Sequence, residues 1–177
     1  MRGILFTEYL DFAVTITSDE IVENILTSLE GRIQGSYTAV GNYSFSEFAK
    51  IHVALCAHLN KDPNDLARQF GQVLLIRFSE LFPNYFEGIS SGVNFLQQVG
   101  LHIHEEVKKL YPDANPPDVH LVEVTSQSYK LTYKSHRPLA SVARGLTEAC
   151  LEYFNDPHRI VSEAIIDGQT EFILEKP

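Results

Sequence analysis

The hydrophobic periodicity of the chain changes at Pro117, and this change constrains the fold more than any other feature. Before it, apolar residues recur at the three- and four-residue intervals of amphipathic helices. After it, two pairs of segments alternate between apolar and polar residues, as strands do: VHLVEV with YKLTYKS, and RIVSEAII with QTEFILE. One helical segment, LASVARGLTEACLEYF, separates the pairs. We therefore expect an α+β protein whose two hairpins form a four-stranded antiparallel sheet.

Local signals mark where the elements begin and end. Ser18 is a suitable N-cap for one helix, and Gly31 closes that helix. The pair Asp167-Gly168 favours a tight turn between the last two strands. Proline ends the fourth and fifth helices at positions 83 and 112. The first five helices are expected at 2–16, 17–31, 44–60, 66–82 and 90–111.

The length of 177 residues suits one domain, which we expect to comprise a mainly helical lobe, 1–62, and an α/β lobe, 63–177. A net charge of −9 argues against nucleic acid and anionic membrane surfaces as partners. No apolar run approaches the roughly 20 residues of a membrane span. Acidic residues interrupt the N-terminal segment, which makes it a poor secretory signal. The expected location is the cytoplasm. Cys56 and Cys150 indicate neither a disulfide framework nor a zinc site.

Two histidines, His102 and His104, stand two residues apart in the helix expected at 90–111. On a helix such residues are separated by roughly 200°, so they cannot both bind one metal ion. A strand would place them on one face, but the apolar spacing favours a helix. A lone helical histidine is most often a partly buried, hydrogen-bonded ring. Gly100, one turn earlier, would allow a flat ligand to approach the backbone near His104.

A second group, Tyr133, Ser135 and Arg137, shares one face if the strand continues through it. Two hydroxyl donors and a guanidinium fork make a good receptor for carboxylates. The alternative is the polar outer face of an edge strand, and the motif alone does not decide between them.

The segment IHEEVKKLYPDANPP, the Tyr-x-Ser-x-Arg motif and the helix ARGLTEACLEYF occur here in an order that resembles the heme nitric oxide/oxygen binding (H-NOX) family. This family comprises gas-sensing domains, free-standing in bacteria and fused in soluble guanylate cyclase. The resemblance covers nearly the whole chain. It implies a heme b between the two lobes, with His104 as the axial ligand of the iron. Tyr133, Ser135 and Arg137 would hold the propionates, and Pro117 would press on the porphyrin. The remaining residues expected to pack against the heme are Leu5, Tyr9, Leu74, Phe78, Leu101 and Val142.

The resemblance also implies which gas binds. Members that bind oxygen carry a distal tyrosine that donates a hydrogen bond, and the matching residue here is Val142. We therefore expect NO and CO to bind ferrous heme and O₂ to be excluded. Loss or strain of the iron–His104 bond would pass the signal to a separate partner, a histidine kinase or a diguanylate cyclase. The last hairpin has no cysteine or histidine, so we expect no zinc site of the kind that some members carry.

Two other functions would fit parts of this pattern. A peroxidase-like heme enzyme would need a polar distal pair, for which Arg68 and Arg77 are the nearest candidates. Arg77 directly precedes Phe78 and should face outward, so we do not expect an enzyme. A heme-free interaction module of the same fold would require His104 to be an ordinary ring.

Overall fold

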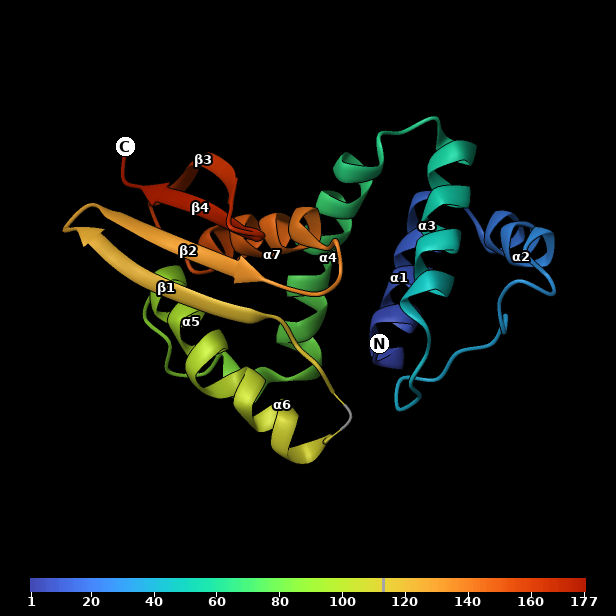
Figure 1. Ribbon diagram of the computed structural model, residues 1–177, viewed down its shortest axis with the longest axis horizontal. Coiled ribbons are helices and arrows are strands. Elements are labelled where there is room, and N and C mark those ends of the chain that lie inside the picture. The colour runs from blue at the N-terminus through green and yellow to red at the C-terminus, as the bar shows by residue number, and fades with distance from the viewer. Residues whose placement is uncertain (113) are drawn as a thin grey trace. The chain divides into compact units, whose positions relative to one another are not determined.

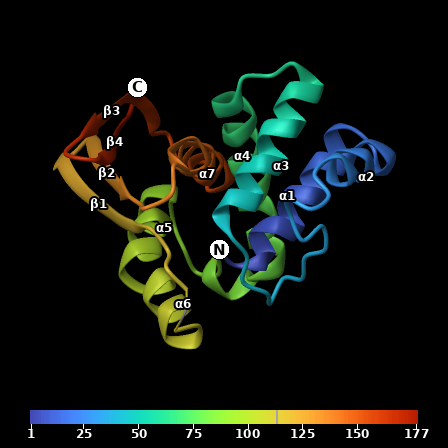
Figure 2. The same ribbon diagram turned by 45° about the vertical axis from the view of Figure 1, so that its right-hand side comes forward.

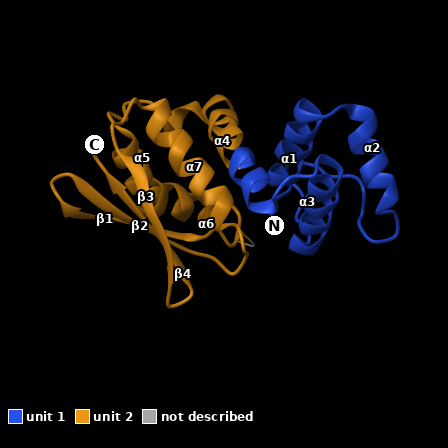
Figure 3. Ribbon diagram, turned by 90° about the horizontal axis from the view of Figure 1, so that it is seen from above, with its two compact units in different colours: residues 1–70 blue, residues 71–177 orange. Residues whose placement is uncertain are grey.

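The computed structural model describes residues 1–112 and 114–177 and divides into two compact units, residues 1–70 and residues 71–177 (Figure 3). The division falls inside the helix α4 (Pro63–Leu81), whereas the boundary expected from the sequence is at residue 62. In the part of the chain that the structure describes, no helix is both long and apolar enough to cross a membrane.

The first unit is helical, as expected. It contains α1 (Gly3–Ile16), α2 (Asp19–Ser28), α3 (Phe45–Leu59) and the first residues of α4. The hydroxyl of Ser18 accepts the Ile21 N–H at 3.3 Å, which confirms the predicted N-cap of α2. Aromatic rings from three helices pack together in the core of this unit: Phe6, Tyr9, Phe12, Phe48 and Phe70.

The second unit contains the predicted four-stranded antiparallel sheet (Figure 1). The strand order is β1-β2-β4-β3, so each hairpin pairs its own strands and the two hairpins meet through β2 and β4. Asp167 and Gly168 both have positive φ, 50° and 76°, which confirms the tight turn between the last two strands. The strands are β1 (Asp118–Thr125), β2 (Ser128–Lys134), β3 (Arg159–Ile166) and β4 (Gln169–Glu175).

One face of this sheet is buried and the other is largely open. Along β4, Phe172 and Leu174 are fully buried, while Ile173 between them lies on the opposite face. The helices α5 (Gly92–Gln98) and α7 (Ala140–Tyr153) cover the buried face (Figure 2). This period-2 alternation is the one expected of a sheet that is solvated on one side.

The helix expected over 90–111 is not a regular α-helix. After the short 3₁₀ turn η1 (Pro83–Tyr85), α5 runs into a π-helical segment, η2 (Val99–Ile103), and then into α6 (His104–Leu110). A Cβ on Gly100 would overlap the Val119 carbonyl oxygen of β1. The glycine therefore allows η2 to pack against the backbone of β1, and this contact fills the space that the sequence suggested for a flat ligand.

Replacing Phe172 tests whether the sheet is buried on one face only. Phe172→Ala should lower the free energy of unfolding by about 3–5 kcal/mol, because it leaves a cavity beneath α5 and α7. Ile173→Ala, one residue away on the open face, should cost roughly 1 kcal/mol. Urea denaturation of both variants measures the two costs, and equal costs would contradict the layer arrangement.

Candidate functional site

His104 is the first residue of α6 and follows the π-helical segment η2 directly. One extra residue in a helical turn rotates every later side chain by about 100° relative to a continuous α-helix. The direction of the His104 side chain therefore depends on η2. Because Gly100 of η2 is seated against the Val119 carbonyl, β1 holds this segment in place. His102, within η2, is exposed.

The His104 ring is half-buried, and its surroundings favour the neutral form. Burial lowers the pKa of His104 below its usual value, and Lys108 acts in the same direction. The nearby backbone of Pro117 raises this pKa in opposition. The Nδ1 atom is buried and has no hydrogen-bond partner among the described residues. A neutral imidazole is the form that binds a metal.

The residues expected to form a carboxylate receptor lie at and beyond the end of β2. Tyr133 is buried in the strand, but the strand ends at Lys134, so the prediction that all three residues share one strand face is wrong. Instead, the Ser135 hydroxyl accepts the Arg137 N–H at 3.1 Å and turns the chain locally. Burial raises the pKa of Tyr133, while Ser135 and Arg137 lower it, so both lie near the phenol.

The loop between α6 and β1 connects the two groups. Arg137 donates from Nη1 to the Asn115 carbonyl at 3.1 Å, which engages one of the five N–H donors of its guanidinium. Pro117, two residues later in the loop, lies beside His104. Asp113, which belongs to the motif used in the sequence analysis, lies outside the described residues.

The residues expected to pack against a heme differ in exposure. In the second unit, Leu74 and Val142 are buried, Phe78 is half-buried, and Leu101 is 54% exposed. In the first unit, Tyr9 is buried and Leu5 is half-buried.

The Tyr9 hydroxyl and the His52 Nδ1 atom are 2.7 Å apart. The other His52 nitrogen, Nε2, lies 3.0 Å from the Pro63 carbonyl, which can only accept. Nε2 therefore carries the proton, and Nδ1 accepts the proton of Tyr9. Burial lowers the pKa of His52, which favours the neutral ring that this arrangement requires. Tyr9 thus has its only proton committed to His52.

Sequence analysis missed one buried polar pair, Asp156 and His158, whose side chains are only 1% and 7% exposed. The Asp156 carboxylate accepts from the His158 ring at 2.6 Å and from the Val93 N–H at 3.1 Å. The local sequence, Asp-Pro-His after a helix, resembles an ordinary surface turn, and only its burial reveals it.

The arrangement around His104 fits a heme. A heme needs a single axial side chain from the protein and a polar receptor for its propionates. The half-buried His104 could provide a neutral nitrogen ligand, and Tyr133, Ser135 and Arg137 could provide the receptor. Across residues 1–112 and 114–177, no three histidine, cysteine or acidic side chains gather as a metal site.

Comparisons with known proteins identify the same family that the sequence motifs resemble. The model of the family described as Haem-NO-binding matches residues 2–162. An unliganded Fe(II) H-NOX protein of K. algicida is 30% identical, over 100% of this chain and 97% of its own, with a TM-score of 0.89. An H-NOX variant from S. oneidensis is 23% identical over 99% and 95% of the two chains, with a TM-score of 0.89.

An oxygen-binding H-NOX domain related to soluble guanylate cyclases is 23% identical over 98% of this chain and 93% of its own, with a TM-score of 0.79. Likeness at this level of identity shows a shared fold and carries no ligand across. The comparison with curated proteins gave no match.

The pH dependence of stability tests the buried carboxylate. Burial raises the pKa of Asp156, but the bonds from His158 and Val93 outweigh it and hold that pKa below its usual value of about 3.9. The charged form therefore stabilises the fold above about pH 4. That contribution is lost as the pH falls through the lower native pKa. Urea unfolding between pH 5 and pH 3 should show a steeper loss for the wild type than for Asp156→Asn, and parallel curves would contradict the assignment.

Proposed function

Since the chain belongs to the Haem-NO-binding (H-NOX) family of heme-binding gas-sensor domains, we propose that it senses NO at a ferrous heme b. It also binds CO and forms no stable complex with O₂. In this proposal the chain signals to a separate protein and catalyses no reaction. The observation that carries the proposal is the half-buried His104, whose buried Nδ1 has no described partner and whose pKa is lowered, together with the group Tyr133, Ser135 and Arg137, which the loop after α6 links to it.

A bound heme would supply an iron that can take up a gas. His104 would be the protein ligand of that iron, and its lowered pKa favours the unprotonated imidazole at neutral pH. Arg137 and the hydroxyls of Tyr133 and Ser135 receive the propionates, because buried carboxylates need charged or hydrogen-bonding partners. Pro117, which lies near His104 in the loop before β1, would pack against the macrocycle.

The proposed gas selectivity depends on the lack of a proton donor. Bound O₂ is stabilised by a hydrogen-bond donor, whereas NO binds ferrous heme without one. Val142, Leu74 and Phe78 are the proposed distal residues, and none of them has a donor. Tyr9 is also proposed to pack near the heme, but it donates its proton to His52. The hydroxyl of Tyr9 therefore has no proton left for a bound gas.

The proposed output begins at His104. A bond between its imidazole and the iron would tether α6, and strain or loss of that bond would release this tether. Two packings of one segment that differ by a few kcal/mol are sufficient for a switch of this kind. A separate histidine kinase or diguanylate cyclase is the proposed partner that responds.

Absorption spectra of the ferrous protein test this proposal. We expect a heme Soret band that changes with NO and with CO, and no stable oxygen complex in air. His104→Gly should lose the native ferrous spectrum and regain it in part when imidazole is added. A stable oxygen complex would contradict the proposed selectivity. A chain that takes up no heme would instead favour a heme-free interaction module.

Adding a donor at position 142 tests the origin of the selectivity. Val142→Tyr should stabilise bound O₂ by about 1.5–3 kcal/mol, or roughly 10- to 150-fold in affinity. Val142→Phe adds the same ring without the hydroxyl and serves as the matched control. Oxygen titration of both ferrous variants measures the effect. Equal affinities in the two variants would exclude the hydroxyl as the cause.

Removing the guanidinium tests the propionate receptor. Arg137→Ala should weaken heme retention by about 1–3 kcal/mol, or roughly 5- to 150-fold, because a charge-assisted contact is lost. Lys134→Ala removes an exposed positive charge three residues earlier and should leave retention unchanged. Transfer of heme to an excess of apomyoglobin measures both rates. Equal rates for the two variants would remove Arg137 from the site.

A further inference from the structure

The helical segment that carries His104 is held at three places. α5, η2 and α6 follow one another without a loop from Gly92 to Leu110. Near its middle, Gly100 packs against β1, and near its end Glu106 accepts the Tyr85 hydroxyl at 2.8 Å on an exposed surface. Its start is held by the buried Asp156. The pose of His104 depends on these three attachments.

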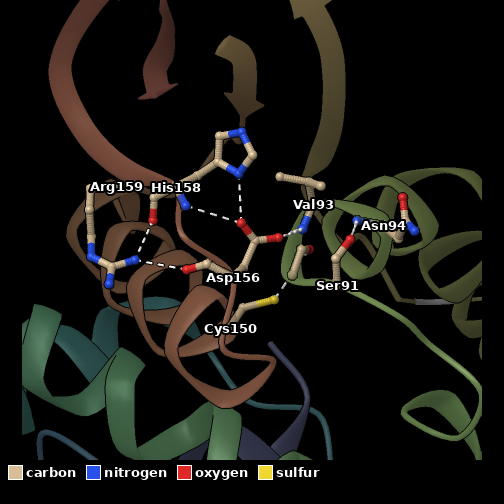
Figure 4. Close-up of polar contacts among 8 residues, drawn as sticks. Ser91, Val93, Asn94, Cys150, Asp156, His158 and Arg159 are labelled. Atoms are coloured by element: carbon tan, nitrogen blue, oxygen red, sulfur yellow. Dashed lines mark hydrogen bonds and ion pairs between the residues drawn. The ribbon is translucent and has the colours of Figure 1, made fainter. Parts of the chain in front are cut away.

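At the start of α5, the helical segment is held by close packing and by a charged hydrogen-bond acceptor, Asp156. A Cβ on Gly92 would lie 2.9 Å from the Leu151 Cα atom and 3.2 Å from the Asp156 Cβ atom, so the helix start is pressed against the end of α7. The Cys150 thiol donates to the Gly92 carbonyl at 3.6 Å. Asp156 Oδ2 accepts the Val93 N–H in the first helical turn (Figure 4). A carboxylate there also interacts favourably with the helix dipole.

The second carboxylate oxygen of Asp156 is occupied by His158. Oδ1 accepts both the His158 backbone N–H at 3.1 Å and the ring Nδ1–H at 2.6 Å, as Figure 4 shows. The Arg159 guanidinium donates to the carbonyls of Asp156 and His158 and fixes the backbone of this turn. The carboxylate therefore cannot rotate away from Val93 without breaking several bonds.

The position of the His158 ring has an energetic cost. It packs edge-on against Tyr129, with ring centroids 5.2 Å apart. Its Nε2 atom is buried, and within the described part of the chain it has no hydrogen-bond partner. An unsatisfied buried polar atom costs about 1–3 kcal/mol. A leucine would fill this space without that cost, so packing alone does not explain a histidine here, whereas orienting Asp156 does.

We propose that Asp156 and His158 are positioning residues for His104: His158 orients the Asp156 carboxylate, and Asp156 fixes the start of the helical segment that aims the imidazole. This inference rests on the proposed role of His104 as the axial ligand. It makes the bond between His104 and iron depend on a pair of residues in the loop between α7 and β3. That loop joins the edge strand β3 to the rest of the unit, so a change at this edge reaches His104 through one carboxylate.

Resonance Raman spectroscopy of the ferrous, heme-loaded full chain tests the pair. The iron–histidine stretching band reports the pose of the His104 imidazole. Asp156→Asn and His158→Leu should shift or broaden this band at unchanged heme content. His158→Asn should restore it, because the asparagine amide can donate to Asp156 in place of Nδ1–H. If Asp156→Asn does not fold, the comparison of the leucine and asparagine variants at position 158 decides.

A matched control separates positioning from general loss of stability. Arg144→Gln breaks the ion pairs of Arg144 with Glu148 and Glu163, in the same unit but away from the helical segment. It should lower the unfolding free energy and leave the band in place. A band that stays fixed in folded His158→Leu, or that moves equally in Arg144→Gln, would overturn the inference. If the wild-type band persists in His104→Gly, the proposed axial ligand is wrong instead.

Discussion

The buried nitrogen of His104 is the constraint on which the rest of the second unit depends. A buried polar atom without a partner costs about 1–3 kcal/mol, and a helix could avoid this by turning the ring to solvent. Here the π-helical turn and the seat of Gly100 against β1 prevent that rotation. The same burial keeps the ring neutral. The imidazole is therefore already oriented, and already in the neutral form, before a metal binds to it.

The loop that follows α6 links the two groups of candidate residues. Asn115 receives the Arg137 guanidinium, and Pro117 lies beside His104. A cofactor with a metal at its centre and carboxylates at its edge matches this pairing of a nitrogen ligand with an anion receptor. Neither group alone distinguishes such a cofactor from an ordinary buried ring or a polar strand edge. Their linkage through one short loop is what favours such a cofactor.

The elements of the fold could be predicted because their signals are local. Ser18 caps α2 through its own hydroxyl, and Asp167-Gly168 adopts the positive φ values that its hairpin needs. The π-helical turn could not be predicted, because apolar spacing tolerates one extra residue. What fixes that residue is the contact of Gly100 with a strand that forms later in the chain.

The candidate site is only partly accessible from the sequence. The motif nominates His104 and the three expected receptor residues, but it does not predict how the structure arranges them. Ser135 and Arg137 are joined by a side-chain hydrogen bond where a strand ladder was expected. Asp156 accepts a hydrogen bond from the Val93 N–H, 63 positions away in the chain, and no local sequence pattern predicts a pairing at that separation. Short-range sequence signals predict individual helices and strands. The buried Asp156 carboxylate, which holds the start of α5 against the end of α7, can be recognised only in the packed unit.

A crystal structure of the ferrous, unliganded, heme-loaded protein tests the central claim most directly. The account predicts continuous density between the His104 imidazole and the iron, with the propionates at Tyr133, Ser135 and Arg137. An iron bound by another side chain, or a His104 ring turned to solvent, would contradict it.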